Sequence, residues 1–256
     1  MALIEVGGRR IEYERIEVAA AGRPTLVFLH EGLGSLAMWR DFPGHVAHAT
    51  GCNAIVYSRY GYGNSESLHE ARTVRYMHDE ALIALPLLLD KLALARPILL
   101  GHSDGGSIAL IHAGGAQHPV AGLVLMAPHV MVEGISVTSI AAAKVAYETT
   151  DLRSKLARYH ADVDSAFWGW NRIWLDPEFR RWNIEEYLPR ITCPVLAIQG
   201  EDDEYGTMEQ INRIGRAVPD AELVELADCR HSPHKDQPAA VIEAMTRFVD
   251  RITSAS

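Results

Sequence analysis

The chain has 256 residues, of which 48% are hydrophobic and 22% charged, and its formal net charge is −9 at pH 7. This length and composition are typical of one large globular domain with a sizeable core, and they exclude a disordered chain. The acidic balance and the lack of a Lys/Arg-rich run argue against nucleic acid and membrane surfaces as partners.

Short apolar runs predict the strands of a sheet that is buried on both faces. The first pattern, over residues 4–18, predicts a β-hairpin with its turn near Gly7 and Gly8. The later predicted strands are 25–29, 54–57, 98–100, 122–126, 195–199 and 222–226. The predicted helices are 39–49, 73–92 with a kink at Pro86, 107–113, 206–217 and 238–252. This alternation predicts an α/β fold with a doubly wound, mostly parallel sheet.

One region, residues 133–189, has no strand pattern and is compatible with helices. It holds four of the five tryptophans, and we interpret it as a helical cap over the carboxyl ends of the strands, where ligands bind in such sheets. The core domain would then be 1–132 and 190–256. Most of these aromatic side chains are expected only to bury the cap. The candidates for an apolar, substrate-binding pocket wall are Phe167, Trp168, Trp170 and Trp174.

The segment Gly101-His102-Ser103-Asp104-Gly105 matches the pattern G-x-S-x-G between a predicted strand and a predicted helix. That context is typical of a nucleophile elbow, a sharp turn on which glycines avoid collisions and the serine hydroxyl is raised above the sheet. An ordinary strand-to-helix turn is the alternative interpretation of the motif taken alone.

A serine nucleophile needs a base, and the base needs a group that fixes its tautomer. Acidic residues follow the predicted strand 195–199, and His231 and His234 follow the predicted strand 222–226. The order Ser, acid, His agrees with that of α/β hydrolases.

Over nearly its whole length the chain resembles an α/β-hydrolase-fold serine hydrolase of the carboxylesterase type. The family's G-x-x-D matches residues 200–203, its H-x-P-x-x-[D/E]-x-P matches 231–238, and its R-x-G-x-G-x-S loop matches 59–65. Ser58 stands where that loop usually has a preceding Asp. The resemblance implies Ser103 as nucleophile, His231 rather than His234 as base, and Asp203 rather than Asp202 as its partner.

The family also places an oxyanion loop after the first parallel strand, here His30-Glu31-Gly32-Leu33-Gly34. By position, the backbone N–H groups of Gly32 and Asp104 form the oxyanion hole, which stabilises the negative oxygen of a tetrahedral intermediate. Glu31 departs from the usual Gly, and this makes Leu33 an alternative donor. Glu31, Leu33 and His102 are expected to bind the substrate.

The charge of Asp104 has two interpretations. A carboxylate in the first turn of a helix complements the helix dipole, which needs no ligand. Alternatively, Asp104 and Glu31 present negative charge at the pocket rim and favour substrates with an amine. For Glu31, a solvated loop residue is the favoured interpretation.

The leading hypothesis is a cofactor-free serine hydrolase that cleaves a carboxylic ester, a lactone or an activated amide through an acyl-enzyme. Ser103 argues against the dehalogenases and epoxide hydrolases of the family, which need Asp there. A C–C bond hydrolase of vinylogous diketones, a cofactor-free peroxidase and a ligand receptor that retains the three residues are the alternatives.

No metal site is expected, because the remaining histidines lack ligand spacing. Cys52, Cys193 and Cys229 form neither a metal pair nor a disulfide framework, and residues 1–5 do not begin a signal peptide, so we expect a cytoplasmic protein. The expected partner is a small ester-like substrate, and the expected state is a monomer or small homo-oligomer.

Overall fold

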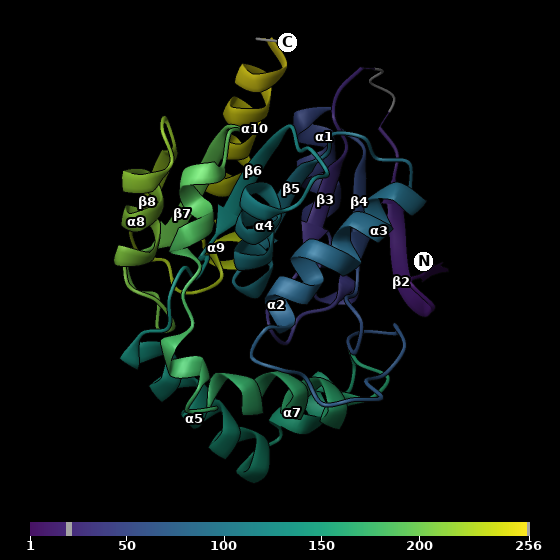
Figure 1. Cartoon of the computed structure of the whole chain (residues 1–256), viewed down its shortest axis with the longest axis vertical. Coiled ribbons are helices and arrows are strands. Elements are labelled where there is room, and N and C mark those ends of the chain that lie inside the picture. The colour runs from purple at the N-terminus through teal and green to yellow at the C-terminus, as the bar shows by residue number, and fades with distance from the viewer. Residues whose placement is uncertain (19–21, 255–256) are drawn as a thin grey trace.

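An eight-stranded sheet runs through the centre of the protein, in the order β1-β2-β4-β3-β5-β6-β7-β8 (Figure 1). The computed structural model describes residues 1–18 and 22–254; residues 19–21 and 255–256, which the predicted core segments include, lie outside the described residues. The strands are β1 (Ala2–Val6), β2 (Arg9–Ile16), β3 (Leu26–Leu29), β4 (Ala54–Tyr57), β5 (Ile98–His102), β6 (Gly122–Met126), β7 (Val195–Gly200) and β8 (Glu222–Leu226).

The sheet is parallel from β4 to β8, and only the β1–β2 hairpin and its pairing with β4 are antiparallel. Every residue of the five strands from β3 to β7 is buried, which explains why each is a continuous apolar run. The hairpin turns at Gly7 and Gly8, both of which have positive φ. The predicted α/β architecture is therefore confirmed.

Helices cover both faces of the sheet. One hydrophobic cluster joins the sheet to α1 and α10, and a second joins its other face to α3, α4 and α8. The α-helices are α1 (Phe42–Thr50), α2 (Tyr76–Asp79), α3 (Leu85–Lys91), α4 (Asp104–Gly115), α5 (Gly134–Thr149), α6 (Leu152–Leu156), α7 (Val163–Trp174), α8 (Glu209–Ala217), α9 (Pro233–Asp236) and α10 (Pro238–Ser254).

Four predicted helices differ from the observed ones, and the simplest case is α8, which begins at Glu209 rather than at 206. Helix α1 begins at Phe42, because a 3-10 turn over Leu36–Trp39 precedes it. The helix predicted over 73–92 begins at Tyr76 and is interrupted by a π-helical turn, Glu80–Ala84, just before Pro86, whose ring cannot continue a regular α-helix. Helix α4 begins directly after Ser103, three residues earlier than predicted.

Residues 134–190 contain α5, α6, α7 and the 3-10 turns Phe179–Arg181 and Glu185–Arg190. In Figure 1, α5 and α7 lie below the sheet, at the end toward which the parallel strands run. One isolated bridge joins Met131 to Asn183, close to the two ends of this segment. The helical content agrees with the expectation, and the division into core and cap domains stays a prediction.

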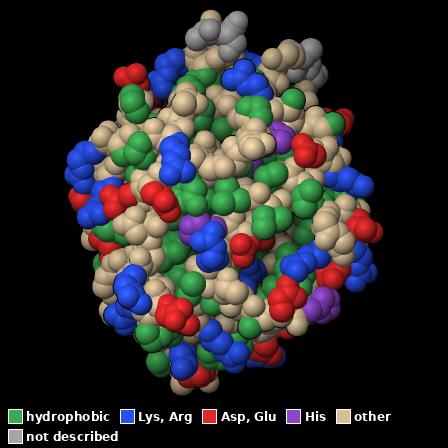
Figure 2. Space-filling view, viewed as in Figure 1, with side chains coloured by type: hydrophobic (Ala, Val, Ile, Leu, Met, Phe, Trp, Pro, Cys, Tyr) green, Lys and Arg blue, Asp and Glu red, His purple; other side chains and the backbone are tan. Residues whose placement is uncertain are grey.

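The surface seen in Figure 2 carries Lys and Arg side chains interspersed with Asp and Glu, so the net negative charge is not gathered into one area of this face. Within residues 1–18 and 22–254, no helix combines the length and apolar character needed to cross a membrane.

Candidate active site

Ser103 lies on the turn between β5 and α4, with φ 52° and ψ −117°. A non-glycine residue rarely adopts this left-handed conformation, and the surrounding structure must therefore enforce it. A Cβ atom at Gly101 would collide with the backbone of Gly105, and one at Gly105 would collide with the backbone of Leu29 in β3. The two glycines thus allow the close approach of strand, turn and helix that holds Ser103 in place.

The structure brings together three side chains from the ends of three different strands. His231 Nε2 lies 2.9 Å from Ser103 Oγ, and His231 Nδ1 lies 2.9 and 2.8 Å from the two carboxylate oxygens of Asp203. Asp203 is buried, whereas the adjacent Asp202 is exposed. Because a carboxylate oxygen accepts, Nδ1 carries the proton and Nε2 is free to accept the hydroxyl hydrogen of Ser103.

Hydrogen bonds fix the Asp203 carboxylate in this position. Gln199 Nε2 donates to it over 2.7 Å, and the backbone N–H groups of Tyr205 and Gly206 donate over 2.7 and 3.2 Å. Burial alone would raise the pKa of Asp203, but the hydrogen bond and charge of His231, with the Tyr205 N–H, hold it below its ordinary value. Asp203 is therefore an ionised acceptor for the His231 ring.

Burial and the nearby His231 lower the pKa of His129 to about 3, so this ring is neutral beside the His231 ring, with the two centroids 5.6 Å apart. His129 was not among the predicted site residues, and neither were four further lining residues. These are Ile140, Glu204, Tyr205 and Ser232. Their positions in the sequence could have indicated most of these residues. His129 follows the end of β6, and Glu204, Tyr205 and Ser232 come directly after Asp203 or His231.

Gly32 and Leu33 line the pocket beside Ser103, as predicted for the oxyanion loop. Among the described residues, we find no hydrogen-bond acceptor for the backbone N–H of Gly32, Leu33 or Asp104. A Cβ atom at Gly32 would collide with the indole nitrogen of Trp170, so only glycine lets this α7 side chain lie against the loop. The helical segment and the loop beside the serine are therefore in direct contact.

Glu31 and His102 form a linked pair beneath the pocket. His102 Nε2 donates to the backbone carbonyl of His231 over 2.7 Å, and His102 Nδ1 lies 3.4 Å from the Glu31 carboxylate. Burial would raise the pKa of Glu31, but the hydrogen bond and charge of His102 hold it well below its ordinary value. The Glu31 side chain is only 17% exposed, so the interpretation of a solvated loop residue is wrong.

The carboxylate of Asp104 does not lie at the pocket rim, and that expectation is also wrong. It accepts a 2.5 Å hydrogen bond from the Tyr76 hydroxyl, lies 3.9 Å from the Arg59 guanidinium and is 1% exposed. Burial raises its pKa, although Arg59 and Tyr76 act in the opposite direction. The turn at Ser103 directs this side chain into the core, and only the backbone of Asp104 remains available to the site.

Two of the four aromatic residues predicted to bind substrate lie elsewhere. Phe167 is fully buried and stacks on Tyr147, with ring centroids 3.7 Å apart, while Trp168 packs edge-on against the same pair. They are absent from the pocket lining because they face α5, whereas Trp170 and Trp174 do line the pocket.

The pocket at Ser103 has a volume of about 190 Å³. Its lining is mixed rather than largely apolar: Leu33, Ile140 and the two tryptophans share it with histidines and with the carboxylates of Glu31 and Glu204. The lining residues that the structure describes include neither Lys nor Arg. The site therefore offers a hydroxyl, an imidazole and N–H donors in a small, uncharged or negatively charged space.

A model of the alpha/beta hydrolase family matches residues 26–244. Among solved structures, a carboxylesterase of Nitrososphaera gargenis superimposes with a TM-score of 0.80 over 100% of both chains at 19% identity. At this identity the likeness concerns the fold.

Two curated relatives are similar over shorter stretches. One is the dihydrolipoyllysine-residue acetyltransferase component of an acetoin cleaving system from Pseudomonas putida, 30% identical over 62% of this chain and 40% of that protein. The other is a proline iminopeptidase of Lactobacillus delbrueckii subsp. lactis, 33% identical over 39% of this chain and 34% of that protein. The chain thus spans less than half the length of these relatives.

Proposed function

This chain belongs to the alpha/beta hydrolase family, and on that premise we propose that it is a serine hydrolase that cleaves small carboxylic esters through an acyl-enzyme, without a cofactor. The observation that carries the proposal is the unbroken line of hydrogen-bonding distances from Ser103 through His231 to Asp203. A serine hydroxyl is a weak nucleophile near neutral pH, and this arrangement is the one that activates it.

In the first half of the reaction, Ser103 Oγ attacks the ester carbonyl while His231 Nε2 takes the hydroxyl proton. Asp203 stabilises the resulting imidazolium and keeps its ring in the correct tautomer. His231 then gives the proton to the oxygen of the leaving alcohol, and the acyl group stays on Ser103. In the second half, His231 takes a proton from water, the hydroxide attacks the acyl carbon, and the acid leaves as Ser103 regains its proton.

The negative oxygen of each tetrahedral intermediate needs donors on the side opposite His231. The backbone N–H groups of Gly32 and Asp104 fill this role in the proposal, with Leu33 as the alternative donor on the loop. Loss of one such donor costs about 2.7–4 kcal/mol of transition-state stabilisation in comparable hydrolases. The burial of the Asp104 carboxylate on Tyr76 and Arg59 supports the assignment, because it keeps this negative charge turned away from the oxyanion.

The pocket supports a substrate that is small and carries no negative charge. Its volume of about 190 Å³ lies below the roughly 300–1,000 Å³ of most small-molecule sites, so short acyl and alcohol groups fit best. Glu31 and Glu204 would repel an anionic ester, and no cationic lining residue is described that would bind one. The cytoplasmic location and the monomeric or small oligomeric state stay predictions.

The test combines covalent labelling with steady-state turnover. The wild-type protein should react with a fluorophosphonate probe at Ser103 and should turn over p-nitrophenyl acetate many times, whereas Ser103→Ala should do neither. A single acylation without turnover would instead indicate a receptor, and turnover that persists in Ser103→Ala would overturn the serine mechanism. The values of kcat/KM for lactones, amino-acid anilides and vinylogous diketones should be compared with those for esters, and the proposal expects the highest values for esters.

A further inference from the structure

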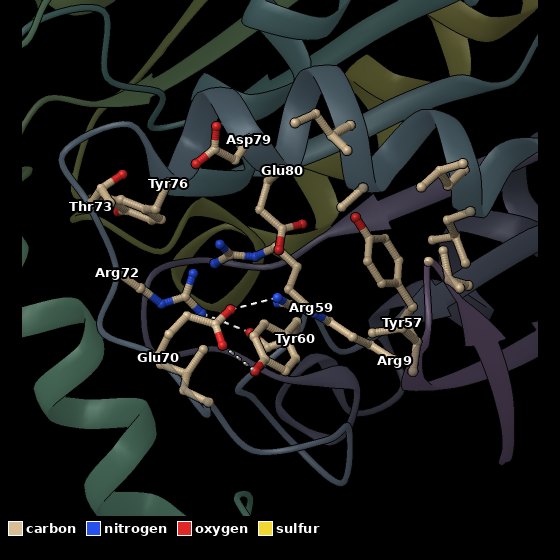
Figure 3. A pocket seen from close by; sticks show the side chains of 18 of the residues that line it. Arg9, Tyr57, Arg59, Tyr60, Glu70, Arg72, Thr73, Tyr76, Asp79 and Glu80 are labelled. Carbon is tan, nitrogen blue, oxygen red and sulfur yellow. Dashed lines mark hydrogen bonds and ion pairs between the residues drawn. The ribbon is translucent and has the colours of Figure 1, made fainter.

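A second cavity, of about 430 Å³, lies between the β1–β2 hairpin and the α2–α3 segment (Figure 3). It is larger than the pocket at Ser103, and the two linings share no residue. Its volume falls within the roughly 300–1,000 Å³ of small-molecule sites. The ester-hydrolysis proposal gives it no role.

One part of the cavity wall is aliphatic, while Glu70, Thr73 and Asp79 make its exposed part polar. Val6 and Ile11 come from the hairpin, Leu68 from the loop after β4, and Ile83, Leu87 and Leu88 from the helical segment. Ile83 and Leu87 are 59% and 44% exposed and lie side by side on this wall. A ligand with an apolar body would cover this surface.

The inner end of the cavity is polar and rich in donors. Arg59 is fully buried, and its Nε and Nη1 have no hydrogen-bond partner among the described residues. The same holds for the Tyr57 hydroxyl and for Arg72 Nε. A buried donor left without an acceptor costs about 1–3 kcal/mol, so these groups together favour an acceptor.

Glu80 is the carboxyl group at this end, and Figure 3 shows it beside the Arg59 guanidinium. It is 7% exposed, and no hydrogen bond or ion pair within 4 Å joins it to another described residue. Burial raises the pKa of Glu80, although the charges of Arg59 and Arg72 oppose the shift. The guanidinium groups of Arg59 and Arg72 repel a cation at this end of the cavity.

We propose that this cavity binds a small amphipathic monocarboxylate, with its carboxylate toward Arg59 and Arg72 and its hydrocarbon chain along the aliphatic walls. An alcohol of the same length would offer fewer acceptor sites to the donors, and an amine placed at the inner end would meet the guanidinium groups of Arg59 and Arg72. A monocarboxylate thus provides an acceptor for the buried donors and a hydrocarbon chain for the aliphatic wall.

The cavity is connected to the serine pocket through two of its lining residues. Arg59 donates to the backbone carbonyl of Glu31 over 2.9 Å, on the oxyanion loop, and Tyr76 donates to Asp104, next to Ser103. A ligand that engages Arg59 therefore touches a group that holds the catalytic loop. Binding itself does not depend on the ester-hydrolysis proposal.

Calorimetric titration of the intact protein with hexanoate, hexan-1-ol and hexylamine tests the ligand class. Hexanoate should bind saturably at one site. The alcohol and the amine should bind at least about tenfold more weakly, because the alcohol replaces the charge-assisted hydrogen bond by a neutral one and the ammonium group is repelled by the guanidinium groups. Equal binding of all three compounds, or of none, would overturn the proposal.

Two variants test the location. Ala84→Phe places a ring in the cavity and should abolish hexanoate binding, whereas Ala142→Phe, at an exposed position of α5, should leave it unchanged. Glu80→Gln should tighten binding by about tenfold, because it removes the negative charge of the carboxyl group beside Arg59, whereas the other lining carboxylates, Glu70 and Asp79, stay in place. Unchanged affinity in both Ala84→Phe and Glu80→Gln would place hexanoate elsewhere and refute the assignment; if Ala84→Phe does not fold, Glu80→Gln decides alone.

Discussion

Ser103 and Asp104 are neighbours in the chain, yet their side chains belong to two different regions of the molecule. The Ser103 hydroxyl faces the pocket and His231, while the Asp104 carboxylate is buried against Tyr76 and Arg59. In the proposed mechanism the first region carries out the reaction, whereas the contacts of the second hold the turn in place. The comparison shows that the strained φ of Ser103 separates the two roles over a single peptide bond.

The largest expected effect lies on the reactive side of this comparison. Ser103→Ala should lower kcat by roughly 10⁴–10⁶-fold, because the nucleophile is lost, and should change the free energy of unfolding by less than about 1 kcal/mol. Ester turnover and thermal unfolding of the same preparation measure both quantities. A large loss of stability would mean that Ser103 also holds the turn, which would blur the comparison.

Asp203→Asn should have the next largest effect on activity, a loss of about 10⁴-fold in kcat, because the amide favours the wrong tautomer of His231. The matched control is Asp202→Asn, the exposed neighbour, which should keep nearly full activity. Equal losses in the two variants would contradict the assignment of the acid to position 203.

Much of the fold could be predicted because buried parallel strands are continuous apolar runs, and the order of Ser103, Asp203 and His231 along the chain placed them at one sheet edge. The environment of Asp104 could not be predicted in this way. Its partners, Arg59 and Tyr76, are 45 and 28 residues distant in sequence and meet it only after the chain has folded. Sequence motifs therefore predicted that Ser103 lies near Asp203 and His231, but they did not predict the buried contacts of the Asp104 carboxylate.

The aromatic residues of α7 give a similar lesson. Phe167 and Trp170 lie on one apolar stripe of an amphipathic helix, but Phe167 packs on Tyr147 of α5 while Trp170 reaches Gly32. A helical period predicts which residues are buried and not which neighbour buries them. That distinction depends on the position of α7 relative to the sheet, which no local pattern contains.

The buried side of the comparison is tested by Asp104→Asn. It should destabilise the protein by about 3 kcal/mol, because the buried Arg59 loses the one carboxylate within 4 Å among the described residues. The backbone N–H stays, so kcat for a neutral ester should fall by much less than in Ser103→Ala. Chemical denaturation and ester turnover measure the two effects.

Asp104→Asn also tests charge selection. The ratio of kcat/KM for a matched pair of esters, with and without an α-amine, should be the same in the variant as in the wild type, because the carboxylate does not face the pocket. A changed ratio would show that Asp104 influences substrate charge despite its burial.

The smallest expected effect concerns Glu31 and His102, which join the oxyanion loop to the His231 loop. Glu31→Gln should lower the free energy of unfolding at pH 7 by about 1.5 kcal/mol, because the charge contact of the Glu31 carboxylate with His102 Nδ1, 3.4 Å away, is lost. The folded-state pKa of Glu31 lies below its unfolded value, so this contribution is present above the unfolded pKa of about 4.3 and is lost as the pH falls through the folded pKa. Urea unfolding at pH 7, 5 and 3 should therefore show the two proteins converging in acid, while the exposed control Glu5→Gln matches wild type throughout. A difference in unfolding free energy that persists at pH 3 would mean that Glu31 stabilises the protein through packing rather than through its charge. Glu31 and His102 would then resemble the buried contacts of Asp104 more than the groups around Ser103.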